Sequence, residues 1–257
     1  MKLYLQFLSI HLREAMTYRA SFCLSCLGHL MTTMNVFFGV VFLLDRFQTI
    51  GGYTLPQLAL CFSVVLSASG LAECFGRGFD VFHQLLSDAR FDRIMVRPRP
   101  LVFQVLCQEI KPAVFFRFVN GMILLVWAVR SGAVAWTPWK WASLALMVLC
   151  GAMVFFGVYL INAAVCFFTL EHVEVLNIFT DGAREYSKYP FGVYGKGVLY
   201  ILTFLVPLAL VQHWPLQYLL DRGPAWYGAL PLAALVFLLP CAGLWRLGVR
   251  RYCSTGS

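Results

Sequence analysis

The fold is decided by residues 141–170, WASLALMVLCGAMVFFGVYLINAAVCFFTL, a run without a single charged side chain. A helix of about 20 apolar residues crosses the hydrocarbon layer of a bilayer, so this run is long enough to do so. Working outward from it, the chain is predicted to have six spans, at about 20–44, 54–73, 111–130, 141–170, 197–213 and 225–245. The third includes Lys111 and Arg117 near its start, where long basic side chains can reach the interface. We therefore predict an all-α integral membrane protein with one domain over residues 1–257.

The composition agrees with this class. The chain is 60% hydrophobic and 12% charged, whereas about 25% of a soluble domain is charged. Its net charge of +8 indicates orientation in a membrane, and no basic block interleaved with aromatic residues indicates nucleic acid. We expect contact with the lipid bilayer and no nucleic-acid partner.

The basic residues predict the orientation of the chain. With both termini in the cytoplasm, fifteen of the twenty Lys and Arg residues lie on the cytoplasmic side, as the positive-inside rule requires. These fifteen are Lys2, Arg13, Arg19, Arg77, Arg90, Arg93, Arg97, Arg99, Lys111, Arg184, Lys188, Lys196, Arg246, Arg250 and Arg251. The opposite side receives Arg46, Arg130, Lys140 and Arg222.

Residues 2–19 precede the first span. Leu3, Phe7 and Ile10 recur at helical spacing, and His11 and Arg13 supply polar positions. This pattern predicts an amphipathic helix in the cytoplasmic interface; the alternative is a plain extension of the first span.

The longest cytoplasmic segment joins the second and third spans. Over residues 77–88 it predicts a short helix whose apolar face is formed by Phe79, Phe82, Leu85 and Leu86, flanked by Asp80 and Asp88. Pro98 and Pro100 then prevent any helix from continuing. Acidic residues alternate with arginines here, which orientation alone does not require, so the segment is typical of a surface that docks another protein.

Motifs for chemistry are missing from the chain. The nearest match to a phosphate-binding loop, GVYGKG at 192–197, has the wrong spacing and lacks the hydroxyl that would bind Mg²⁺. H-E-x-x-H is absent, and we expect no catalytic residue and no metal site. No span carries a carboxylate at mid-depth, which argues against proton- or sodium-coupled transport.

Polar residues inside the spans are candidates for the transport pathway or for a helix interface. Asn35 and Asn162 are the main ones, and their side chains favour hydrogen bonds between helices. Ser63 and Ser67 follow Ala59 at intervals of four, a small-residue stripe that lets another helix approach closely.

Two stretches of the chain resemble the ABC-2-type permeases, the membrane subunits of type V ABC transporters. The first is FDRIMVRPRPLVFQVLCQEI, residues 91–110, with Asp92 and the pair Arg97-Pro98. The second is FTDGAREYSKYPFGVYGKGVLYILTFLVPLALVQHWPLQYLL, residues 179–220. It contains a Gly-x-Arg-Glu core, followed by Tyr-Pro; the residues concerned are Gly182, Arg184, Glu185, Tyr189 and Pro190.

The resemblance implies a function and its partners. It implies a permease without cofactors of its own, paired with a second permease, identical or homologous. Two copies of a cytoplasmic ABC ATPase would supply ATP and Mg²⁺, and the helix at 77–88 would insert its apolar face into that ATPase. It also implies export across the cytoplasmic (inner) membrane of a bacterium.

Two other classes remain alternatives. A lipid-modifying intramembrane enzyme would require His, Asp or Glu gathered at one depth, which the sequence does not supply. A channel or scaffold subunit without an ATPase could use Asn35, Asn162 and the serine stripe equally well.

Overall fold

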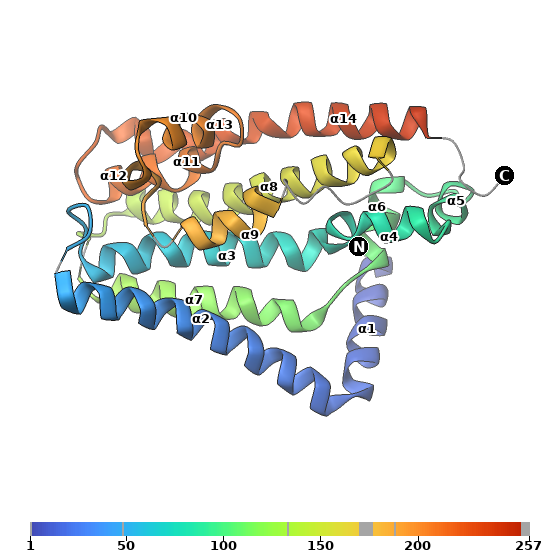
Figure 1. The fold of residues 1–257 in the computed structure, drawn as a ribbon, viewed down its shortest axis with the longest axis horizontal. Coiled ribbons are helices and arrows are strands. Elements are labelled where there is room, and N and C mark those ends of the chain that lie inside the picture. The colour runs from blue at the N-terminus through green and yellow to red at the C-terminus, as the bar shows by residue number, and fades with distance from the viewer. Residues whose placement is uncertain (1, 48, 133, 170–176, 188, 253–257) are drawn as a thin grey trace.

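The computed structural model is built of helices and describes residues 2–47, 49–132, 134–169, 177–187 and 189–252 (Figure 1). The long helices are α2 (Arg19–Phe47), α3 (Leu55–Asp80), α7 (Phe115–Arg130), α8 (Pro138–Thr169) and α14 (Leu238–Arg251). Shorter helices are α1 (Lys2–Thr17), α4 (Phe82–Ser87), α5 (Arg90–Met95), α6 (Leu101–Gln108), α9 (Asn177–Tyr186), α10 (Lys196–Phe204), α11 (Leu208–Val211), α12 (His213–Leu219) and α13 (Leu230–Ala234). The 3-10 helices are η1 (Pro112–Val114), η3 (Phe191–Tyr194), η4 (Ala225–Ala229) and η5 (Leu235–Phe237).

The long helices run side by side and α1 lies across them (Figure 1). We call one end of the bundle the α5 end, because α4, α5 and α6 lie there together with the last residues of α14. The opposite end, which holds α12 and the turn between α2 and α3, is the α12 end. Both described termini of the chain are therefore on the α5 side.

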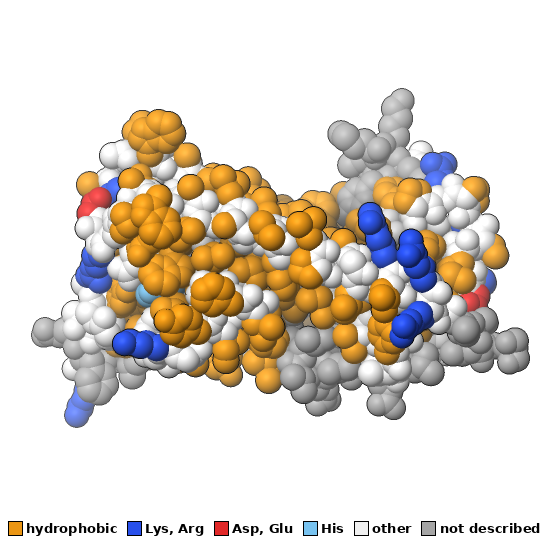
Figure 2. Space-filling model, turned by 90° about the horizontal axis from the view of Figure 1, so that it is seen from above, with side chains coloured by type: hydrophobic (Ala, Val, Ile, Leu, Met, Phe, Trp, Pro, Cys, Tyr) orange, Lys and Arg blue, Asp and Glu red, His pale blue; other side chains and the backbone are white. Residues whose placement is uncertain are grey.

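Five helical stretches of the described chain are long and apolar enough to cross a membrane, namely Arg19–Phe42, Leu55–Ser87, Pro112–Arg130, Pro138–Thr169 and Ala225–Arg251. Hydrophobic side chains cover the middle of the face seen in Figure 2, and Lys and Arg side chains lie toward its ends. This distribution matches a helical bundle whose apolar belt faces hydrocarbon.

Helices α3 and α8 form the centre of the bundle, and α2 lies outside it, packed mainly on α7 and η1. The N-terminus of α3 is capped by a hydrogen bond that the Thr54 N–H donates to Gln57 Oε1 at 3.2 Å. Its small residues bring α7 close: a Cβ added to Gly121 would lie 2.7 Å from the Ser67 backbone nitrogen. The small-residue stripe thus packs within this chain.

The segment from 177 to 194 lies beside α3 and α8 and reaches the α12 end. Asn177 lines a cavity with Asp80, near the α5 end, whereas Tyr189 packs in the same apolar cluster as Tyr53, at the α12 end. Residues 177–194, expected in a cytoplasmic loop, therefore pack along the bundle, and Val193 lies beside Gly51 at the α12 end. The apolar pattern of the sequence does not indicate helix α9, because four of its ten residues, NIFTDGAREY, have charged or amide side chains.

The expected fifth span, 197–213, is instead part of a hairpin. Helices α10 and α11–α12 are bent by 89° against each other, because Pro207 lacks the backbone N–H that would continue the helix. Val193 lies against Gly51 just before the hairpin, and Arg222 Nη2 donates to the Gly52 carbonyl at 3.1 Å just after it. The chain therefore enters and leaves the hairpin beside one turn at the α12 end.

This arrangement corrects the expected placement of one basic residue. Lys196 begins α10 at the α12 end and does not lie with the arginines of the α5 end. Lys188 and the side chain of Arg184 are outside the described part of the structure.

Candidate functional site

A buried carboxylate lies on α3 near the α5 end. Glu73 is only 4% exposed. Arg77, one helical turn further on, donates from Nη1 to Glu73 Oε1 at 2.5 Å. The same Arg77 nitrogen lies 3.6 Å from Asp80 Oδ2. Because a buried charge is costly without a partner, these groups stabilise one another at this depth.

The second partner of Glu73 comes from α7. Arg117 Nη1 donates to Glu73 Oε2, so Arg117 connects the start of α7 to α3. Its side chain is 19% exposed and pairs inside the protein, where the sequence suggested that it reaches toward the interface. We call Glu73, Arg77, Asp80 and Arg117 the ion cluster.

Two cavities adjoin the ion cluster. One of about 290 Å³ is lined by the cluster itself together with His83, Tyr159 and Asp181. The other, of about 250 Å³, is lined by Arg117 and Asp181 as well, and extends to His29 and Thr33 of α2 and Glu185 of α9. Because they share Arg117 and Asp181, the cavities form a polar region reaching from the α5 end toward the middle of the bundle.

Beyond the ion cluster, α4 and α5 are anchored by aromatic rings. The Phe82 ring lies 5.2 Å from the Phe91 ring, 5.0 Å from Phe167 of α8 and 5.2 Å from Trp245 of α14. Tyr252 adds a hydrogen bond from its hydroxyl to Asp92 Oδ1 at 3.0 Å. Edge-to-face pairs of this kind add stability beyond burial alone, so α4 and α5 are attached firmly to α8 and α14.

The opposite side of α4–α5 is exposed. Val96 is 84% exposed and Met95 41% exposed, and Arg93, Arg97 and Arg99 are exposed beside them. We call residues 93–99 the basic tip. It combines two apolar side chains with three cations at the α5 end.

The expected insertion face of residues 77–88 is buried in the chain's own core. Phe79, Phe82, Leu85 and Leu86 are each at most 3% exposed, since they cover the ends of α8 and α14. They are therefore not a face open to a partner in this structure. Asp80 belongs to the ion cluster, and the exposed Asp88 pairs with Arg90 at 2.7 Å.

The residues behind the family resemblance are divided between two places. Asp92 accepts the Tyr252 hydrogen bond, and Arg97 and Pro98 belong to the basic tip. Gly182 and Glu185 lie on α9, while Tyr189 and Pro190 follow it toward the α12 end. The structure thus separates the two motifs along the length of the bundle.

The candidate pathway residues also differ in position. Ser63, Ser67 and Asn162 are buried inside the chain, and Asn162 Nδ2 donates to the Asp80 carbonyl at 3.3 Å. Asn35 is exposed on α2. Of these four, Asn35 alone lies on an outer surface of the described chain.

Glu73 stands at the expected end of the second span, so its burial is not evident from the apolar pattern. A signal was nevertheless present: Glu73 and Arg77 have the i,i+4 spacing of a helical ion pair, and Arg117 is a cation in the facing span. The aromatic partners Phe167, Trp245 and Tyr252 are all far in sequence from Phe82 and Phe91, so no local pattern could bring them together with those rings.

A family model described as an ABC-2 family transporter protein matches residues 30–256. The chain belongs to the ABC-2 family. No curated protein and no solved structure matches it. The predicted resemblance is confirmed: this is an ABC-2-type permease, a multi-pass membrane component of a transporter.

Proposed function

We propose that this permease forms half of the passage of an ATP-driven exporter, together with a second permease and two copies of a cytoplasmic ABC ATPase. The observation that carries the proposal is the construction of α4–α5. Its inner face is anchored to α8 and α14 by aromatic rings, and its outer face presents the basic tip. A force applied to the tip would therefore reach several spans at once.

The α5 end is the cytoplasmic end in this proposal. Six basic residues between the last turn of α3 and the start of α7 support this orientation: Arg77, Arg90, Arg93, Arg97, Arg99 and Lys111. Helix α1 lies across the bundle (Figure 1) with Ile10, Leu12 and Met16 exposed, which suits an interfacial helix. The membrane would be the cytoplasmic membrane of a bacterium.

The ATPase would bind at the basic tip and supply ATP and Mg²⁺. The apolar contact would come from Met95 and Val96, and the arginines would select an acidic cleft. Closure of the ATPase pair on ATP would rock α3, α8 and α14 as a unit, in the manner of a hinge or shear motion of packed helices.

The second permease would cover the face formed by α2 and α9. Asn35, Asp181 and Glu185 are exposed on that face, at depths where hydrocarbon would otherwise surround them. Exposing such groups to lipid is costly, so they indicate a protein interface or a water-filled path. The cavity of about 250 Å³ between α2, α3, α7 and α9 would lie beside this path.

The ATPase contact is tested by charge reversal at the tip. We expect the variant Arg93→Glu/Arg97→Glu to lose its cognate ATPase on co-purification, because the tip would then repel an acidic cleft. The matched control, Arg250→Glu/Arg251→Glu, changes an equally exposed pair at the same end and should retain the ATPase. Equal ATPase recovery with both variants would contradict the proposed surface.

A further inference from the structure

A separate cavity of about 470 Å³ lies in the corner between α1 and α2. Its walls come from three stretches that are distant in sequence: the C-terminal half of α1, the first turns of α2, and residues 108–113 leading into η1. It shares no residue with the two cavities at the ion cluster. Neither the permease class nor the proposed ATPase contact accounts for it.

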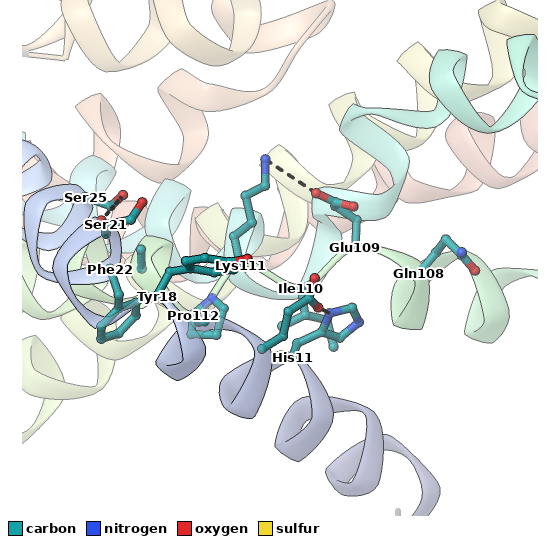
Figure 3. Close-up of a pocket in the computed structure, with 13 residues that line it drawn as sticks. His11, Tyr18, Ser21, Phe22, Ser25, Gln108, Glu109, Ile110, Lys111 and Pro112 are labelled. Carbon is teal, nitrogen blue, oxygen red and sulfur yellow. Dashed lines mark hydrogen bonds and ion pairs between the residues drawn. The ribbon is translucent and has the colours of Figure 1, made fainter.

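The polar groups of this corner include both signs of charge. Lys111 Nζ lies 3.4 Å from Glu109 Oε1, and Figure 3 shows the two side chains projecting together, with Ser21 and Ser25 of α2 on the other side of the cavity. On α1, Glu14 lies 3.5 Å from His11 Nδ1. The corner thus offers one ammonium group and hydroxyl donors beside two carboxylates.

An apolar surface continues from the corner along α2. Leu24, Leu27 and Met31 are all more than half exposed, and they continue at helical spacing from the cavity residue Ser21, three residues before Leu24. Helix α1 runs transverse to the long helices, beside the start of α2 (Figure 1). A ligand with a charged head and an apolar tail would therefore find both parts of its surface here in the right order.

We propose that this corner binds the headgroup of a phospholipid that carries a primary amine. The phosphate would accept hydrogen bonds from Lys111 and the Ser21 hydroxyl, while the ammonium group would donate to Glu109 and Glu14. The acyl chains would lie along the exposed face of α2. The adjacent cation and anion of Lys111 and Glu109 complement the adjacent anion and cation of an ethanolamine headgroup.

Lipid retention by the full chain tests this site. The permease is placed in nanodiscs of equal parts phosphatidylethanolamine, phosphatidylcholine and phosphatidylglycerol with matched acyl chains, then released and measured by native mass spectrometry. We expect phosphatidylethanolamine to be retained about fivefold over phosphatidylcholine, since the quaternary ammonium of the latter has no N–H to donate. Retained headgroups in the same proportions as the bilayer would overturn the proposal.

Variants separate the two halves of the headgroup. Lys111→Gln should lower retention of all three lipids, whereas Glu109→Gln should remove only the preference for the primary amine. Lys111→Arg keeps the positive charge and should retain the lipid, and the control Arg250→Gln, outside the cavity, should behave as the wild type. If Lys111→Gln does not fold, Glu109→Gln and Lys111→Arg still test the site. An unchanged preference of Glu109→Gln for phosphatidylethanolamine over phosphatidylcholine would overturn the assignment.

A last arm separates a lipid from a soluble ligand of the same chemistry. Glycerophosphoethanolamine, which has the headgroup without acyl chains, is added in excess to the lipid-loaded permease. Retention of the lipid would support a membrane source held by the α2 surface. Displacement of the lipid by this soluble compound would overturn the membrane source.

Discussion

Glu73 shows how a single residue gains its meaning from its neighbours. Taken alone it is a carboxylate at the end of an apolar run, yet it is buried and receives hydrogen bonds from Arg77 of its own helix and Arg117 of α7. Two cations on one carboxylate make α3 and α7 electrostatically dependent on each other near the α5 end.

Replacing this carboxylate should be costly. Glu73→Gln keeps the size of the side chain but leaves Arg77 and Arg117 close together without their buried anion, so we expect a loss of about 3 kcal/mol in the free energy of unfolding. Equilibrium unfolding of the purified variant measures this. The control Asp88→Asn breaks an exposed pair with Arg90 and should cost less than about 1 kcal/mol; equal effects would contradict the buried role.

Gly78 tests the close packing between α3 and α6. A Cβ at this position would lie 2.0 Å from the Val105 carbonyl oxygen of α6, and backbone cannot move aside as a flexible side chain can. Gly78→Ala should therefore lower stability by about 1–3 kcal/mol. At Gly243 an added Cβ would have no heavy atom within 4 Å, so Gly243→Ala should be neutral or stabilising. A thermal-shift assay compares the two variants.

At the scale of elements, α4 and α5 act through their attachment to the bundle. The apolar side chains that the sequence offered to a partner are the ones that fasten these helices to α8 and α14. The helical spacing of these side chains predicts a buried face, and they are buried. The spacing alone does not say whether the chain itself or another protein covers that face. In our proposal, the ATPase binds at the exposed basic tip.

Phe82→Ala should test that attachment. The ring is fully buried among Phe91, Phe167 and Trp245, so its removal should cost about 3–5 kcal/mol. Val96→Ala at the exposed tip should stay within about 0.5 kcal/mol of the wild type. The opposite outcome is a Phe82→Ala variant that is as stable as Val96→Ala but no longer binds the ATPase. It would show that Phe82 belongs to the face that inserts into the ATPase, as the sequence predicts.

At the scale of the whole molecule, the path of the chain between α8 and the α10–α12 hairpin runs through the segment from 177 to 194. The polar helix α9 packs against α3 and α8, and the apolar α10–α12 hairpin returns to the side from which it came. Five helical stretches of the described chain are long and apolar enough to cross a membrane, and the bent pair of α10 with α11–α12 is not one straight span.

Cysteine labelling on whole cells distinguishes the two arrangements. In a background without native cysteines, Lys196→Cys and Arg222→Cys should both react with a membrane-impermeant maleimide from outside, because both positions lie at the α12 end. Arg93→Cys, at the α5 end, should react only after the membrane is opened. If Lys196→Cys also required opening, residues 197–213 would be a simple span and α9 would lie in the cytoplasm.

The sequence by itself determined that this chain is helical and lies in a membrane, and its motifs in order determined the ABC-2 family. Long uncharged runs suffice for that, because transferring such a helix into hydrocarbon is favourable whatever surrounds it. The packing of the helices was needed to show that α9 lies against α3 and α8, that Glu73 is paired and that Phe82 faces inward. In each case the environment of a side chain depends on helices remote in sequence, and the cost of burying a charge depends on the partner that meets it there.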